Sequence, residues 1–269
     1  MRVFAVPILS NRWAYYCHST IPTTSRLTKF VSWSNNKWDQ LGTADPKSWK
    51  RKLFDHGNNL MNQLDYQEWF LKGVPTKEHL EQQLEKACVY HPSMLKGPAI
   101  QDDLDLLLQH REPYHKKYMY YSAYWVPISC TFVIVPLIPN IPLAYNLFRL
   151  YSHYKAYKGA QHLQFLSYHN RLEYTPHEKL DETFNGCSLS STSDISFPAE
   201  VSEAFKQPGS KPRLHILQKD IPGALSLETI NELAHELELP ALELELKRAR
   251  FQILCEAAHQ RFNNRNKKE

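Results

Sequence analysis

The chain has 269 residues, enough for one large or two small domains, with a mean hydropathy of −0.52 and 22% charged residues. This polarity excludes a protein made mostly of membrane spans, and a net charge of +4 is too small to indicate nucleic-acid binding by itself. The five cysteines form no Cys-x-x-Cys pair, so they predict neither a disulfide framework nor a zinc site and fit a reducing compartment.

The N-terminus supports two interpretations. The first 38 residues contain no Asp or Glu but several basic and hydroxyl residues, which is typical of a mitochondrial transit peptide. However, residues 3–9 and 13–17 are β-prone runs, and Ser10-Asn11-Arg12 between them can turn. We therefore expect residues 2–18 to form a folded β-hairpin that can also serve as an import signal.

Helical spacing of apolar residues and capping signals dominate the next part of the chain. They predict helices over residues 25–42, from Asp45-Pro46 to about Gly73, and over 77–86, then a short strand at 88–92 that could pair with the hairpin. Another helix begins after Gly97-Pro98 and becomes basic at its end.

An uncharged stretch follows that helix. Residues 118–148 contain no Asp, Glu, Lys, Arg or His, and four prolines interrupt them. A bilayer core needs roughly 20 apolar residues in a helix, so one crossing fits, as does a re-entrant hairpin that enters without crossing. A helical hairpin buried in a soluble core is the alternative. We predict membrane contact, with these interface residues: Arg111, Lys116, Lys117, Tyr118, Tyr121, Trp125, Lys155 and Lys158.

The second half of the chain is predicted to be helical with one interruption. A helix over 143–169 carries aromatic and basic residues, and a Ser/Thr/Gly/Pro-rich linker contains a short helix near 198–206. Two helices, 226–238 and 240–263, form a C-terminal hairpin. The predicted fold is mainly α with a small N-terminal β-hairpin, in four regions: 1–117, 118–170 with the membrane segment, the linker 171–212, and 213–269.

No motif for catalysis was found. The thirteen histidines lack metal-ligand spacing and are predicted to be scattered surface or boundary residues. There is no phosphate-binding loop and no nucleophile motif. We therefore expect a protein that is not an enzyme and needs no metal or cofactor.

Several segments resemble the mitochondrial K+/H+ exchange-related protein family. They are Arg2-Val-Phe-Ala-Val-Pro-Ile with Tyr16-Cys17, Trp38-Asp-Gln-Leu-Gly42, the run from Leu137 to Ala160, and the helix containing Leu246–Ile253. The resemblance covers residues 1–170 and 225–260. Its most specific part is the block Pro139-Asn140-x-Pro142, Asn146-x-x-Arg149-x-x-Ser152.

This resemblance implies the mitochondrial inner membrane and a role in the potassium/proton exchange that controls matrix volume. Because residues 118–148 offer no side chain that exchanges protons near neutral pH, we expect a subunit or regulator, not the conducting unit alone. The expected partners are inner-membrane lipids and other exchanger components, in a homo- or hetero-oligomer, with K+ and H+ as the transported ions and no nucleic acid. The candidate residues for an ion pathway or functional motif are Glu112, His115, Pro139, Asn140, Pro142, Asn146, Arg149, Ser152 and His153.

Three other functions fit the same sequence. A non-transport assembly or scaffold protein of the inner membrane is the main alternative, and a peripheral protein of the membrane surface is the second. A soluble nucleic-acid binder is the weakest, because the basic run Lys247-Arg248-Ala-Arg250 is short and has no aromatic stacking surface beside it.

Overall fold

The computed structural model describes residues 1–19, 43, 45, 48, 51–52, 64–76, 86–131, 141–206 and 215–266. The described chain is mostly helical with a small sheet, which confirms the predicted fold class in this respect. It divides into two compact units. One, the sheet unit, comprises the described parts of 2–18, 86–107 and 169–269; the other, the helical unit, comprises those of 19–85 and 108–168.

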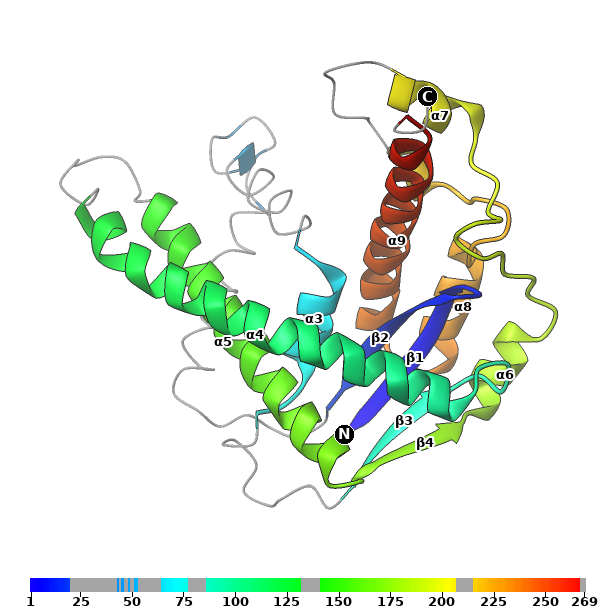
Figure 1. The fold of residues 1–269 in the computed structure, drawn as a ribbon, viewed down its shortest axis with the longest axis horizontal. Coiled ribbons are helices and arrows are strands. Elements are labelled where there is room, and N and C mark those ends of the chain that lie inside the picture. Colours follow the sequence, from blue (N-terminus) through cyan, green and yellow to red (C-terminus); the bar gives the residue numbers. More distant parts are fainter. Residues whose placement is uncertain are drawn as a thin grey trace. The chain divides into compact units, whose positions relative to one another are not determined.

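The sheet unit is built on four strands in the order β2-β1-β3-β4 (Figure 1). β1 (Arg2–Leu9) and β2 (Arg12–His18) form the predicted antiparallel hairpin, and β3 (Ala87–His91) pairs with β1 in parallel. β4 (Leu172–Pro176) adds a further parallel strand, which the sequence analysis missed. Residues 3–9 are buried at every position, because β1 is a central strand with both faces covered.

Helices complete the sheet unit. α8 (Leu227–Glu236) and α9 (Pro240–Asn266) form the predicted C-terminal hairpin, and α9 packs against β1 and β2. The predicted apolar seam of α9 is buried at Leu242, Leu246, Ala249, Ile253 and Ala257. α6 (Glu178–Phe184) follows β4, and α7 (Ala199–Lys206) matches the short helix predicted in the linker.

Two sets of hydrogen bonds fix loop segments of the sheet unit in place. The buried guanidinium of Arg250 donates hydrogen bonds to the carbonyls of Leu217, Lys219 and Leu225, which lie before α8. The backbone of Ser190 bonds to Gly223 and to the turn at Ser10. The described residues around 190 are therefore fastened to the sheet unit by backbone hydrogen bonds.

The helical unit contains α3 (Tyr66–Gly73), the part of α4 (Gly97–Cys130) from residue 108 onward, and α5 (Ile141–Tyr168). α3 ends at Gly73 as predicted, but it begins only at Tyr66, because Asp65 is its N-cap. The single continuous helix predicted from Asp45-Pro46 to Gly73 is therefore wrong, since Leu64 and Asp65 are not helical. α4 and α5 lie side by side in Figure 1, and the Asn146 amide of α5 donates to the Ser122 carbonyl of α4 at 3.1 Å. The predicted helices 25–42 and 77–86 and most of the segment 45–64 lie outside the described residues.

The uncharged stretch is divided in the structure. Residues 118–130 end α4 and residues 141–148 begin α5, while 132–140 lie outside the described residues. Within the described chain, none of the helices combines the length and the apolarity that crossing a bilayer demands. The predicted single transmembrane helix is therefore not supported.

Gly159 sets the contact between α5 and α3, because a Cβ atom at this position would lie only 2.0 Å from the carbonyl oxygen of Leu71. We expect Gly159→Ala to lower the free energy of unfolding by about 1–3 kcal/mol, since the two helices must move apart. Urea unfolding measures this change. Tyr168→Ala, at the exposed end of the same helix, is the control, with a change within about 0.5 kcal/mol. An unaltered Gly159→Ala protein would contradict the close approach.

Candidate functional site

Five polar residues from three helices of the helical unit meet in its interior, and we call them the polar cluster. They are Glu68 of α3, His115 of α4, and Arg149, Ser152 and His153 of α5. Four are almost fully buried, with exposed fractions of 2% for Glu68 and His153 and 0% for His115 and Ser152. Buried groups of this kind must satisfy one another, because water does not solvate them.

Local sequence spacing turns these side chains inward. Glu68 lies three residues before Leu71 on α3, and both side chains are buried. On α5, Arg149, Ser152 and His153 fall at helical spacing on one face, which continues inward through Ala156. His115 continues the buried face of α4 that begins at Leu104 and Leu108.

Glu68 accepts the strongest contacts of the cluster. The Arg149 guanidinium donates to its carboxylate at 2.9 and 3.4 Å, and the Ser152 hydroxyl donates at 2.5 Å. Burial on its own would raise the pKa of Glu68, but the hydrogen bond from Ser152 and the charge of Arg149 outweigh burial and hold this pKa below its usual value. Glu68 is therefore an ionised carboxylate in a buried ion pair.

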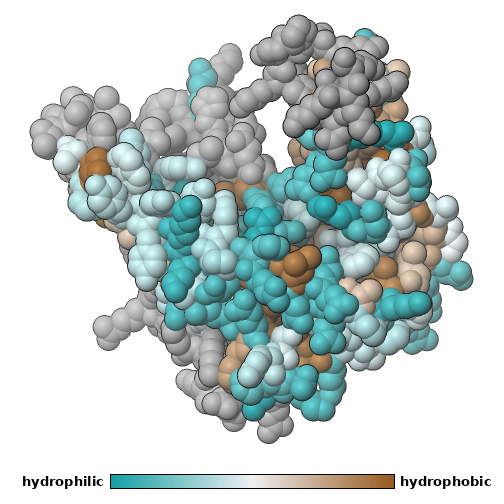
Figure 2. All heavy atoms as spheres, viewed as in Figure 1, coloured by the Kyte–Doolittle hydropathy of each residue, from teal (hydrophilic) through white to brown (hydrophobic). Residues whose placement is uncertain are grey.

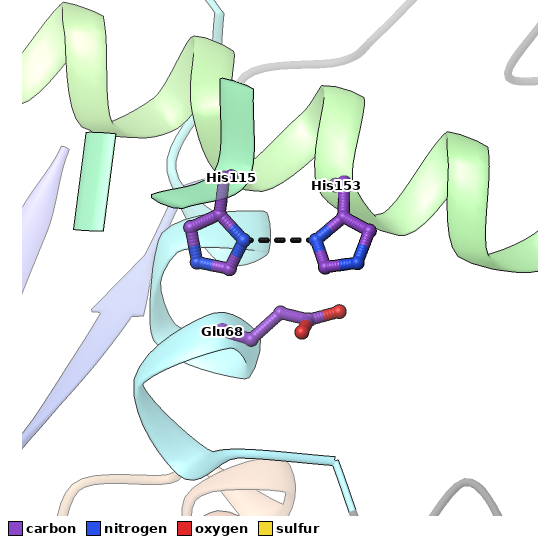
Figure 3. Close-up of side chains that lie close together, drawn as sticks. All are labelled: Glu68, His115 and His153. Atoms are coloured by element: carbon purple, nitrogen blue, oxygen red, sulfur yellow. Dashed lines mark hydrogen bonds between the residues drawn. The ribbon is translucent and has the colours of Figure 1, made fainter. Parts of the chain in front are cut away.

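Arg149 also determines where the imidazole protons lie. One of its terminal nitrogens is 2.7 Å from His153 Nε2, and a guanidinium can only donate, so Nε2 is the acceptor. The His153 proton is then on Nδ1, which donates to His115 Nδ1 at 3.0 Å (Figure 3). The His115 proton is left on Nε2. That buried nitrogen has no hydrogen-bond partner among the described residues.

Both imidazoles are neutral at neutral pH. Burial lowers the pKa of His115 to about 3. Burial, together with the neighbouring charge of Arg149, lowers the pKa of His153 to about 4. The His153 ring stacks on Tyr118 with centroids 5.6 Å apart, and Tyr114 meets the His115 ring edge-on. These tyrosines cover the histidine pair on the α4 side.

The cluster also contains a set of metal-ligating atoms. Glu68, His115 and His153 each offer one donor atom, and the three atoms lie within 4.8 Å of one another. In Figure 3 the Glu68 side chain extends from α3 toward the two imidazole rings. Two imidazoles and one carboxylate are ligands that transition metals accept.

The structure brings together four of the predicted candidate residues: His115, Arg149, Ser152 and His153. Asn146 lies outside the cluster, where it ties α5 to α4, and Pro142 is exposed at the start of α5. Glu112 is half-buried on α4 and outside the cluster. Pro139 and Asn140 lie outside the described residues.

The predicted interface residues divide into two groups. Lys116, Lys117, Tyr118, Tyr121 and Trp125 are exposed on α4, as an interface requires. Arg111 turns toward α3 and pairs with Asp65, and Lys155 and Lys158 are half-buried on α5. Burial lowers the pKa of Lys155.

Two inferences from the sequence need correction. The histidines are not all surface or boundary residues, because His91, His115, His153 and His162 are buried. His115 contacts His153 and His162 contacts the carbonyl of Pro75, and these partners lie far apart in the chain, where a search by sequence spacing does not find them. Glu68, in turn, was not predicted as a site residue. Its one signal was position: in the helix predicted to end at Gly73, a carboxylate four residues after Leu64 falls on the face predicted to be buried.

The comparisons with known proteins identify the family. The model of a family described as mitochondrial K+-H+ exchange-related matches residues 2–167, which is more than half of the chain and contains the whole polar cluster. The chain belongs to this family. Membership relates the protein to mitochondria and to K+/H+ exchange. The C-terminal segment, for which a resemblance was also expected, lies outside the matched residues.

Two yeast relatives extend the comparison. The chain is 24% identical over 279 aligned positions to the uncharacterized protein YDL183C of Saccharomyces cerevisiae, covering 90% of this chain and 84% of that one. It is 27% identical over 150 residues to the uncharacterized protein C23H3.12c of Schizosaccharomyces pombe, covering 54% of this chain and 66% of that protein, just under two thirds. No solved structure matches the chain.

The ion pair of the polar cluster can be tested by removing one charge. Glu68→Gln keeps the size of the side chain and its bond from Ser152 but leaves the Arg149 charge without its partner. We expect the free energy of unfolding to fall by about 3–5 kcal/mol, measured in urea. Glu112→Gln on α4 is the matched control. The double variant Glu68→Gln/Arg149→Met should lose less than the sum of the two single variants; additive losses would contradict the pairing.

The histidine pair makes the protein sensitive to acid. An unfolded histidine has a pKa of about 6.5, while the folded values are about 3 for His115 and about 4 for His153. The free energy of unfolding is therefore highest, with respect to these two histidines, above about pH 6.5. It decreases as the pH falls toward the pKa values of the folded state, because the unfolded chain binds protons that the folded chain does not. Urea unfolding at a series of pH values from about 7.5 to about 5 should show the free energy of unfolding decreasing as the pH falls.

A variant isolates this contribution. The slope of unfolding free energy against pH is proportional to the number of protons taken up on unfolding. His115→Phe should lower that number by up to about one. His110→Gln, on the exposed face of the same helix, is the control and should leave the slope as in the unmodified protein. Equal slopes for all three proteins would show that His115 is not buried in its neutral form.

Proposed function

We propose that the protein is a subunit or regulator of potassium/proton exchange at the mitochondrial inner membrane, and that it is not the conducting unit by itself. The observation that supports this most directly is an exposed aromatic surface on a chain that belongs to the K+-H+ exchange-related family. Apart from Tyr114, which lies one turn earlier on α4, this surface lies on the parts of α4 and α5 that bear the uncharged stretch.

The aromatic surface has an unusual composition for a face in contact with water. Its exposed members on α4 include Tyr124 at 70% and Trp125 at 53%, and Leu147 of α5 is 46% exposed. The complete set is Tyr114, Tyr118, Tyr120, Tyr121, Tyr124, Trp125, Ile128, Tyr145 and Leu147. In Figure 2 this end of the α4–α5 pair, at the left, is mostly pale, because tyrosine and tryptophan have intermediate hydropathy.

These side chains suit the boundary between lipid and water. Tyrosine and tryptophan concentrate at that boundary because their rings are apolar and their tips are polar. Lys116 and Lys117 are exposed at the beginning of the surface, and residues 118–148 carry no acidic group that would repel anionic headgroups. Each basic residue near such a membrane contributes about 1 kcal/mol. Contact of this kind needs no crossing helix.

The chemistry of the polar cluster supports a regulatory role over a conducting one. An exchanger needs a group that trades a proton for a cation at membrane depth. The uncharged stretch has no such side chain, and the carboxylate of the cluster is occupied by Arg149. These residues favour a protein that acts on an exchanger together with partners.

The function can be tested in two complementary systems. Mitochondria without the protein should lose much of their K+/H+ exchange, measured as potassium flux driven by a pH gradient, and re-expression should restore it. The purified protein alone in lipid vesicles should give no exchange. Robust exchange from the single component would refute the role of subunit or regulator. Unchanged potassium flux in the deficient mitochondria would instead favour an assembly or scaffold function.

The aromatic surface gives a separate prediction. The full chain should co-sediment with vesicles that contain anionic lipid, and Tyr124→Ser/Trp125→Ser should weaken this binding at least about tenfold, because two large side chains no longer enter the interface. Leu244→Ser, which alters a 60% exposed residue on α9, is the matched control. Equal binding of the double variant and the unmodified protein would rule out this surface as the site of lipid contact.

A further inference from the structure

The polar cluster has one feature that its hydrogen bonds do not explain: metal-ligating atoms from three different helices lie close together. Glu68 comes from α3, His115 from α4 and His153 from α5, and one ligating atom of each lies within 4.8 Å of the others. All three side chains are buried, so a cation among them would be shielded from competing water.

We propose that Glu68, His115 and His153 form a binding site for a divalent transition metal ion, with Zn²⁺ as the best-fitting cation. Two histidines and one glutamate are a recurrent set of three zinc ligands, and they leave a fourth position open. This inference goes beyond the proposed function, which assigns no role to a metal.

The separation of the two imidazole nitrogens fits this ion. Zinc lies about 2.0–2.1 Å from histidine nitrogen, so two nitrogens in a tetrahedral site are about 3.3 Å apart. His115 Nδ1 and His153 Nδ1 are 3.0 Å apart. The two nitrogens therefore need to separate by only about 0.3 Å for the ion to replace the proton that His153 Nδ1 donates to His115.

The Arg149 side chain competes with a metal ion for two of these ligand residues, Glu68 and His153. Its guanidinium contacts the Glu68 carboxylate at 2.9 Å and His153 Nε2 at 2.7 Å. When a metal binds His153 Nδ1, the ring proton moves to Nε2, which then faces a donor of Arg149 and repels it. Metal binding and the contact between Arg149 and His153 are therefore mutually exclusive, and the 16% exposed Arg149 side chain must turn away.

Other features of the cluster match the surroundings of a metal ligand. Ser152 donates to Glu68 Oε1 at 2.5 Å and orients the carboxylate, as outer hydrogen bonds commonly do for ligands. His115 Nε2 has no hydrogen-bond partner among the described residues, so no second hydrogen bond prevents this ring from turning its Nδ1 toward an ion.

Calorimetric titration of the purified full chain with Zn²⁺ tests the site, and Co²⁺ adds a ligand-field spectrum that reports coordination by nitrogen and oxygen. We expect one ion per chain and a Co²⁺ spectrum of low coordination number. His115→Asn and His153→Asn should each lower the affinity at least about tenfold. His110→Asn, on the exposed face of α4, should bind as the unmodified protein does.

Arg149→Gln gives the most specific test, because its expected result is tighter binding, whereas misfolding would weaken binding. Removal of the competing guanidinium should raise the affinity for Zn²⁺, with the same spectrum for Co²⁺. Circular dichroism verifies that Arg149→Gln and each histidine variant are folded. Absence of binding to the unmodified chain and to Arg149→Gln would overturn the proposal, and so would equal binding by folded His115→Asn and the unmodified chain.

Discussion

The helical unit depends on how a buried carboxylate is neutralised. Glu68 lies in the interior of the unit, where an unpaired charge would cost several kcal/mol, and Arg149 supplies the compensating charge from another helix. Because the guanidinium can only donate, the same residue fixes the proton of His153, and through it the orientation of His115 on α4. One ion pair therefore sets the mutual positions of α3, α4 and α5 at this level.

The orientation of α5 is the opposite of the common one for an amphipathic helix, whose apolar side faces the interior. Its polar side, with Arg149, Ser152 and His153, faces the interior, and the side with Leu147 is partly exposed. The polar cluster uses the inward face, so apolar and aromatic side chains remain on the outside near the uncharged stretch. The membrane contact that we propose and the buried cluster are thus two consequences of the same helix orientation.

Local sequence signals predicted much of the fold. The β-hairpin, the strand at β3, the starts of α4 and α5, and the C-terminal helices follow from alternation, capping residues and helical spacing, which act over a few residues. β4 was missed because Leu172–Pro176 has only five residues and ends in proline, so its alternation of apolar and polar side chains is too short to stand out. Its pairing with β3 depends on a strand that lies more than 80 residues earlier in the chain.

By itself, the sequence determined the family, most of the helices, the uncharged stretch and four of the five residues of the polar cluster as candidates. Only the tertiary structure decided that these four meet, and that Glu68 completes them. His115 and His153 are separated by 38 residues and Glu68 and Ser152 by 84, so no local pattern records their contact. Chemistry that is assembled from three helices becomes visible only when packing brings the helices together, because burial and pairing are properties of the folded chain and not of any one segment.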